Sequence, residues 1–431
     1  MKGEQTSIPT SKVQRATRFL KTGAKVGGNY IKHYSKKMFD AELSRDQLDN
    51  DNAEDIYDSL SELKGSALKV AQMLSMDKNV LPTAYQDKFA MSQYSAPPLS
   101  YPLVVQTFRK YLGKSPEDLF DTFTKEAVNA ASIGQVHKAT RDGKTLAVKI
   151  QYPGVADSIS SDLKIVRPIA ARMFKISTAE LEQYIGEVES KLIEETDYSL
   201  ELKRSMEITG LCGHLEGIEF PTYYPELSSD RILVMDWING LHIKEWLATN
   251  PSQEQKNEIG QRLWDFYDFQ IHTLKQVHAD PHPGNFMITD SGKLGIIDFG
   301  CVKEIPEDFY EQYFKLMKDD VLNPDYNLKD LFFELGFLSD KDTEKEKAFY
   351  LDIFTEMIEL LGRPFRSKTF DFGDDTYFKQ IFEVGDRVSK MKEIRNSKTA
   401  RGNRHGLYIN RTYFGLYNLL NELKAKVITS H

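Results

Sequence analysis

One stretch constrains this chain more than any other: residues 278 to 300, which read HADPHPGNFMITDSGKLGIIDFG. Two short apolar runs within it flank the turn formers Asp-Ser-Gly at 290 to 292, and this pattern predicts a β-hairpin. A hairpin brings its two ends together, so Asn285 and Asp298 should lie side by side. Because Mg²⁺ prefers a few protein oxygens together with phosphate, these two residues are candidate metal ligands. Asp280, in the loop just before them, is then placed to take a proton or to orient a nucleophile.

The same stretch supports a rival chemistry, because His278, Asp280 and His282 form a His-x-Asp-x-His cluster. Two imidazoles with a carboxylate can bind Zn²⁺, which would make the chain a zinc hydrolase. This interpretation predicts zinc in the purified protein and leaves the later Asp-Phe-Gly unexplained. Both histidines are also compatible with ordinary loop positions that hydrogen-bond the backbone.

A second informative region lies upstream, where the pattern changes to strands from about residue 120. Asp142 and Gly143 form a strong hairpin-turn signal, and LAVKIQYP follows them. Three aliphatic residues alternate with other types in that segment, so a period of two puts Lys149 on the opposite face of the strand. A lysine so placed either faces solvent or meets a ligand.

Residues 157 to 207 are predicted to be helical, and they become acidic toward their end. Glu195, Asp197 and Glu201 fall within two turns, and the last two, four residues apart, should share a helix face. Like charges at that spacing are unfavourable, so we expect cations to lie against the cluster. Lys149, Lys69 and Mg²⁺ are the candidates.

The remaining segments predict a second, mostly helical half. RILVMDWING reads as a strand leading into a Gly turn at an interlobe hinge, where Met235 and Trp237 are candidate nucleotide-binding residues. Residues 253 to 277 are predicted to form one long helix that runs into the His278 loop. After Gly300 the sequence is helical, and it closes on an amphipathic helix, RTYFGLYNLLNELKAKV.

Composition bounds the class of protein. With 431 residues, 40% hydrophobic and 28% charged, the chain is typical of a globular protein with more than one lobe. Its two cysteines form no CxxC pair, so we expect a reducing, cytoplasmic compartment. We find no apolar run of 18 residues and no signal peptide, so no transmembrane helix is expected.

The net charge of −8 hides an asymmetry, because residues 1 to 37 carry nine Lys or Arg and one acid. Apolar residues recur at helical spacing among those basic residues, which predicts an amphipathic helix. Such an arm suits an anionic membrane surface and peripheral membrane association. The alternative is a solvated helix packed on the acidic body, and nucleic acid is not the expected partner.

Taken together, the motifs resemble the UbiB/AarF family of atypical, protein-kinase-like proteins over roughly residues 55 to 300. Several separate motifs occur in the family's order: KGSALKVAQ, NAASIGQVH, AVKIQYPGV, EETDYSLE, HADPHPGN and IDFG. The spacing D-x4-N followed by Asp-Phe-Gly after a hairpin is the layout of a kinase-like catalytic loop.

The resemblance implies a role for each matching position. Lys149 would contact the ATP phosphates, with Glu201 as its ion-pair partner, and Asp280 would be the catalytic-loop aspartate. Asn285 and Asp298 would bind Mg²⁺, and the alanine-rich loop that replaces a glycine-rich loop would bind the nucleotide through Ala130, Ala131 and Ser132. Lys69 and Gln72 would lie in a helical extension over the active site, where the lysine pairs with Glu195 of the Glu-x-Asp motif completed by Asp197.

Two departures from the family's pattern bear on nucleotide preference, and one further position differs from ordinary protein kinases. The family's KxGQ reads KVAQ here, with Ala71 in place of glycine, and the alanine-rich loop begins with Asn129. Ala279 occupies the position of the arginine in the kinase His-Arg-Asp motif. Such a site fits a protein that is not switched by activation-loop phosphorylation.

We therefore expect an α+β, two-lobed protein-kinase-like fold with a helical N-terminal extension. The predicted parts are a basic arm (1–52), a helical extension (53–118), an N-lobe (119–238) and a C-lobe with a helical tail (239–431). The predicted function is Mg²⁺-dependent ATP or ADP binding with ATPase or small-molecule or lipid phosphotransfer, linked through the family to quinone and isoprenoid-lipid metabolism. The alternative is a catalytically weak ATP-binding module that couples nucleotide state to a lipid or protein partner. A homodimer is left open.

Overall fold

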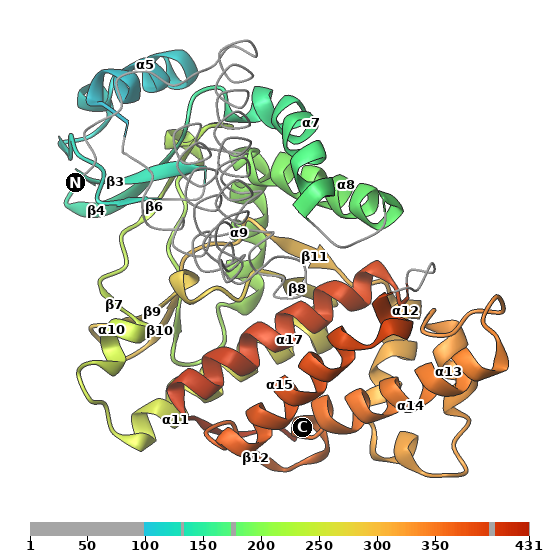
Figure 1. Cartoon of the computed structure of the whole chain (residues 1–431). Coiled ribbons are helices and arrows are strands. Elements are labelled where there is room, and N and C mark those ends of the chain that lie inside the picture. Colours follow the sequence, from blue (N-terminus) through green and yellow to red (C-terminus); the bar gives the residue numbers. More distant parts are fainter. Residues whose placement is uncertain (1–98, 131–132, 174–177, 396–400, 431) are drawn as a thin grey trace, which may run out of the picture. The chain divides into compact units, whose positions relative to one another are not determined.

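The computed structural model describes residues 99–130, 133–173, 178–395 and 401–430 (Figure 1). These residues form two compact units. Unit 1 holds the described residues up to Lys203 together with Thr222–Trp237, and unit 2 holds Arg204–Pro221 and everything from Ile238 onward. The predicted basic arm and most of the predicted extension, with Lys69 and Gln72, lie outside the described residues.

Unit 1 is built on a sheet that comprises, among its described residues, five strands in the order β1-β3-β4-β6, with β2 also paired to β3. Their bounds are β1 Thr122–Phe123, β2 Asn129–Ala130, β3 Gly134–Arg141, β4 Lys144–Gln151 and β6 Ile232–Asp236. The predicted hairpin turn is confirmed: Asp142 and Gly143 both adopt positive φ, 52° and 76°, as a two-residue turn between right-twisted strands requires.

The face of this sheet opposite Lys149 is packed with aromatic and hydrogen-bonded side chains. His137 is fully buried and stacks on Phe123, with ring centroids 4.9 Å apart. Its Nδ1 lies 2.7 Å from the carbonyl of Thr124 and its Nε2 2.8 Å from the amide of Gln135, so a neutral ring satisfies both contacts. Burial lowers the pKa of His137, which keeps it neutral. This face therefore serves packing.

The segment predicted to be helical from residue 157 to residue 207 is divided among separate helices in the structure. The helices of unit 1 are α5 Tyr101–Leu112, α6 Pro116–Leu119, α7 Val155–Met173, α8 Thr178–Glu195 and α9 Tyr198–Cys212, the last of which crosses into unit 2. The expectation that Asp197 and Glu201 share one helix face is wrong, because α8 ends at Glu195. Asp197 instead caps α9: its Oδ1 accepts the Leu200 N–H at 3.0 Å. A negative charge is favourable at a helix N-terminus, so the like-charge penalty does not arise there.

Unit 2 contains the predicted hairpin around residue 290. Its described residues include a four-stranded sheet, in the order β5-β10-β9-β7. The bounds are β5 Ile218–Glu219, β10 Leu294–Ile296, β9 Phe286–Thr289 and β7 Gly240–His242. Ile296 pairs with Phe286, and the Ile297 N–H donates to the Asn285 carbonyl at 3.1 Å. The hairpin ends therefore meet, as predicted.

The helix before the His278 loop ends earlier than predicted. After α10 Ile243–Leu247, α11 runs from Gln253 to Asp268 and continues as a π-helical segment, Phe269–Leu274. Lys275 then adopts φ 53°, which ends the helical path. Gln276–His278 form a strand, β8, that pairs with β11 Val302–Glu304. His278 is thus a fully buried strand residue, whereas the sequence placed it in a loop.

The remaining helices of unit 2 match the helical patterns after Gly300. They are α12 Glu307–Tyr313, α13 Leu328–Glu334, α14 Glu344–Leu361, α15 Asp375–Lys390, α16 Lys392–Arg395 and α17 Arg404–Leu423, with 3₁₀ turns η5 Phe314–Met317, η6 Asp319–Leu322 and η7 Pro364–Arg366. Lys424 (φ 51°) ends α17, so Lys426–Ile428 form strand β13 against β12 Thr369–Asp371 instead of extending the helix. No helix in the described ranges is both long enough and apolar enough to cross a membrane.

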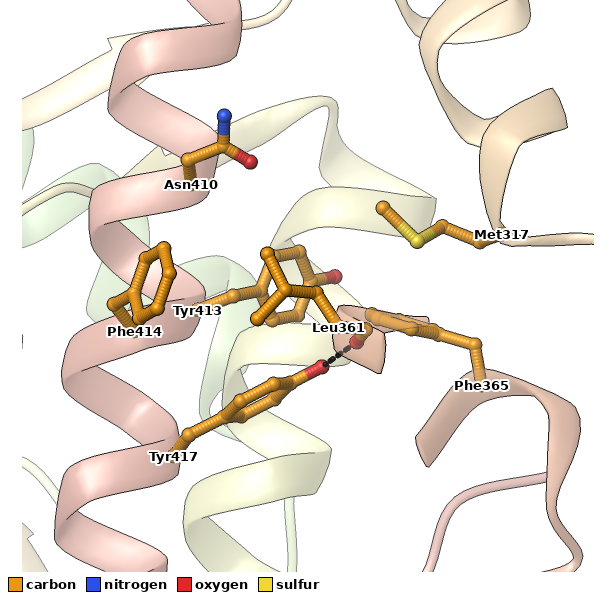
Figure 2. Close-up of a pocket in the computed structure, with 7 residues that line it drawn as sticks. All are labelled: Met317, Leu361, Phe365, Asn410, Tyr413, Phe414 and Tyr417. Atoms are coloured by element: carbon orange, nitrogen blue, oxygen red, sulfur yellow. Dashed lines mark hydrogen bonds between the residues drawn. The ribbon is translucent and has the colours of Figure 1, made fainter. Parts of the chain in front are cut away.

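A small pocket lies at α17, between the end of α14 and the turns η5 and η7 (Figure 2). Figure 2 shows Tyr417 donating to the Leu361 carbonyl, an O···O distance of 3.1 Å. The cavity is about 20 Å³, room for little more than one water molecule. It is therefore too small for a nucleotide.

Candidate functional site

Unit 1 holds Lys149 in a buried ion pair. Its Nζ donates to Oε1 of Glu201 over 2.7 Å, and the two side chains are 11% and 5% exposed. The same Nζ lies 5.0 Å from the ring centroid of Tyr198, which is fully buried. A buried lysine and carboxylate each lose hydration, so a pairing this short offsets part of that cost and fixes where the ammonium points. Lys149 thus lies against the acid cluster, as the sequence predicted, through its bond to Glu201.

The sheet face that carries Lys149 is lined by small and apolar residues. Strand register places Val136 directly opposite Lys149, and Ala147 directly opposite Met235. Residues paired in this way project from the same face of a sheet, so Lys149 and Met235 share one face. An apolar surface beside a fixed cation suits a ligand that joins a flat ring to phosphate.

Trp237 directly follows β6 and is the last residue of unit 1 in the sequence. Its N–H donates to the Thr145 carbonyl at 3.0 Å, which continues the pairing of β6 with β4. Lys138, from β3, places its Nζ 4.8 Å from the Trp237 ring centroid. Ala130, one of the three loop residues predicted to bind the nucleotide, has its backbone in β2, paired with Gln135. Ala131 and Ser132 lie outside the described residues.

The junction between α8 and α9 is what positions Glu201. The Thr196 carbonyl accepts two side-chain donors, Gln151 Nε2 at 2.9 Å and Arg231 at 2.7 Å. Gln151 belongs to β4, two residues beyond Lys149, so the strand that carries the lysine also holds the start of the helix that carries Glu201. Glu195 and Asp197, the predicted Glu-x-Asp motif, flank this junction.

Unit 2 carries Asp280 and Asn285 in one short loop, and Asp298 just after the hairpin that follows it. Asp280 follows β8, and its backbone carbonyl accepts the Asn285 Nδ2–H at 3.0 Å. That bond orients the Asn285 amide so that its Oδ1, a hard oxygen, is the atom left to meet a cation. Asp298 follows β10, and its Oδ1 accepts the Gly300 N–H at 2.8 Å. Both side chains are only partly buried. An amide oxygen and a carboxylate at adjoining hairpin ends fit Mg²⁺.

The structure does not favour the zinc interpretation. His282 Nδ1 accepts the Gly284 N–H at 3.0 Å within its own turn. His278 is buried in β8, where its Nδ1 is hydrogen-bonded to the Tyr267 hydroxyl at 3.2 Å. Within the described ranges, no three His, Cys, Asp or Glu side chains are arranged to hold a metal ion. The two histidines therefore act as structural supports of the loop.

Buried groups behind the loop hold it from α11 and its π-helical extension. Gln270, fully buried, accepts the His278 N–H at 3.0 Å. Burial, and to a lesser extent the negative charge of Asp280, raise the pKa of Tyr267 well above its ordinary value, so the phenol stays protonated. Phe299, the residue after Asp298, is fully buried near Phe266 and His278. The loop thus rests on a well-packed base.

The comparison with protein families decides the classification. The model of the ABC1 atypical kinase-like domain matches residues 91–329, more than half of the chain. The chain belongs to this family. Membership of the ABC1 family confirms the resemblance drawn from the motifs, and with the structural comparison below it establishes the two-lobed kinase-like α+β fold.

Relatives span most of the chain. It is 28% identical to "Atypical kinase COQ8, mitochondrial" of Saccharomyces cerevisiae, over 98% of this chain and 84% of that protein. It is 27% identical to "Probable serine/threonine-protein kinase abkA" of Dictyostelium discoideum, over 89% and 73%. The solved structure of the Rv3197–erythromycin complex from Mycobacterium tuberculosis has a TM-score of 0.61 and 25% identity, covering 90% of this chain and 96% of that one. The ABC1 chain is therefore an atypical kinase-like protein.

Sequence reasoning missed several residues that shape the site. Two of them, Val136 and Ala147, could have been found from the hairpin-turn signal. A two-residue turn at Asp142 and Gly143 fixes the register of the flanking strands, which puts Val136 opposite Lys149. Continuing that register adds Ala147 to the same face. Nothing in the sequence marks Gln151, Arg231 or Gln270, because each acts through a backbone group that only the fold brings close.

Proposed function

We propose that this ABC1 protein binds ATP or ADP with Mg²⁺ and transfers the γ-phosphoryl group to a small-molecule or lipid acceptor, or to water. The observation that carries the proposal is the buried Lys149–Glu201 pair on an apolar sheet face. Solubility does not explain a lysine held at this depth, because an exposed lysine would make the protein soluble equally well. Neutralising phosphate charge does explain it.

The residues of each unit would have separate tasks. Lys149 would offset negative charge on the phosphates, and Glu201 would hold its ammonium in place. Asn285 and Asp298 would hold Mg²⁺, which when bound neutralises charge on the phosphate oxygens. Asp280 would accept a hydrogen bond from the acceptor hydroxyl or water and so orient it for attack. Met235 and Trp237 would contact the base.

The acceptor is the least constrained part of the proposal. The family resemblance favours an acceptor linked to quinone or isoprenoid-lipid metabolism. The structural neighbour from Mycobacterium tuberculosis was solved as a complex with erythromycin, so a chain of this fold binds a small molecule. A lipid or another small molecule is therefore proposed before a protein acceptor.

Steady-state ADP release separates an enzyme from a binding module. With ATP and Mg²⁺, we expect the purified chain to release ADP over many turnovers. Removing Mg²⁺ with a chelator should lower the rate by at least about tenfold, because metal stabilisation of phosphate charge contributes several kcal/mol and 1.36 kcal/mol is a factor of ten. A chain that binds ATP but forms no ADP, with or without lipid, would establish the binding-module alternative.

A further inference from the structure

The C-terminal helix α17 approaches the Asp280 loop unusually closely, at Gly415. A Cβ atom at Gly415 would lie 2.8 Å from Pro281 Cβ and closer still to Pro281 Cγ. Carbon atoms do not approach so closely without a shift of one partner. Pro281 directly follows Asp280, and its ring cannot rotate away as a flexible side chain would. Glycine is therefore the residue that lets helix and loop touch.

The same helix also contacts segments on both sides of the loop in sequence. Tyr408, two turns before Gly415, lies on the same helix face, and its ring centroid is 5.4 Å from Lys303 Nζ on β11. The Tyr413 hydroxyl is 3.3 Å from His272 Nε2, in the π-helical segment that leads into β8. Both contacts anchor α17 to elements that frame Asp280.

We infer that α17 sets the position of Asp280, with Gly415 as the positioning residue. This inference rests on the proposed function, because that function gives Asp280 its role. An added methyl group at Gly415 must push either the helix, which Tyr408 and Tyr413 anchor, or the backbone beside Asp280. A displacement of about 1 Å in a reacting group can lower a rate by about a hundredfold.

The test compares Gly415→Ala with Gly406→Ala on the same helix. A Cβ at Gly406 would meet Tyr313 at 3.4 Å and Phe309 at 3.6 Å, which are ordinary contacts. We expect Gly415→Ala to lower kcat for ADP release by about ten- to a hundredfold, while ATP still binds one per chain with a Kd within about twofold of wild type. Gly406→Ala should keep the wild-type kcat.

A second variant keeps the inference testable if Gly415→Ala folds poorly. A merely structural defect would reduce the number of nucleotide sites and leave kcat per bound nucleotide unchanged. Pro281→Ala removes Cγ, the ring carbon that comes closest. Gly415→Ala should therefore lower kcat by a smaller factor in the Pro281→Ala background than in wild type. If the two substitutions lower kcat by factors that simply multiply in the double variant, the contact between Gly415 and Pro281 is not the cause.

The outcomes also separate this inference from the proposed function. A wild-type chain that forms no ADP would refute the proposed turnover, and the inference with it. A wild-type chain that turns over, with Gly415→Ala indistinguishable from Gly406→Ala, would refute the positioning role alone.

Discussion

Replacing Asp280 by Asn should lower steady-state ADP formation by about 10²- to 10⁴-fold while leaving nucleotide binding in place. Asparagine keeps the size of the side chain but carries no charge and is a far weaker proton acceptor. The loop should keep its shape, because its bond to Asn285 comes from the Asp280 backbone carbonyl, which the substitution does not alter. Rates and nucleotide affinity are measured on the same preparation.

The matched control for this variant is Asp290→Asn, in the turn of the neighbouring hairpin. Asp290 is exposed, and its backbone N–H donates to the Asn239 carbonyl. Its replacement should leave turnover unchanged. Equal rates for Asp280→Asn and Asp290→Asn would remove Asp280 from the proposed chemistry.

Replacing Lys149 by Met should destabilise the folded protein by about 3–5 kcal/mol as well as stop turnover. The substitution removes the Lys149 ammonium from the Glu201 carboxylate, whose side chain is only 5% exposed. Denaturant unfolding of wild type and Lys149→Met, compared at equal protein concentration, gives this difference in the free energy of unfolding. Combining Lys149→Met with Glu201→Leu should recover much of the stability, because the buried charge is removed, but it should not recover turnover.

Lys144→Met is the control on the same strand. Lys144 is exposed and donates to the Tyr224 hydroxyl at 3.2 Å, so its loss should change the free energy of unfolding far less than the loss of Lys149. A Lys149→Met protein as stable as Lys144→Met would mean that the Glu201 pair contributes little to folding. Turnover retained by Lys149→Met would contradict its assignment to the phosphates.

The sequence predicted local structure well wherever a turn and an alternating pattern coincided. Asp142-Gly143 and Asp290-Ser291-Gly292 each gave a hairpin with the expected flanks, and period two placed Lys149 on the correct face. These features depend on neighbours within a few residues, which is why a single sequence contains them. In the second hairpin, Asn285 at the start of the first strand lies beside the end of the second strand, and this follows from the same local geometry.

The sequence was less informative where a helix ended or where distant residues meet. The prediction from the sequence continued the helix of residues 157–207 through Asp197, because acidic residues are tolerated in helices. The capping role of Asp197 becomes visible only when the structure shows that α8 ends at Glu195. The prediction missed β8, since Gln276–His278 pair with a strand more than twenty residues away. Glu201 was assigned to Lys149 by family resemblance, because 52 residues separate them and no local pattern links them.

The central claim is that a nucleotide site depends on the Asp298 carboxylate and Mg²⁺. Thermal unfolding of wild type, Asp298→Asn and Asp290→Asn, with ATP or ADP in the presence of Mg²⁺ or a chelator, tests it most directly. A ligand at a hundred times its Kd stabilises a protein by roughly 2.7 kcal/mol, which raises the unfolding midpoint by a few degrees. We predict this rise for wild type and Asp290→Asn with Mg²⁺ only, and no rise for Asp298→Asn. No shift of wild type with either nucleotide, or an equal shift of Asp298→Asn, would contradict the claim.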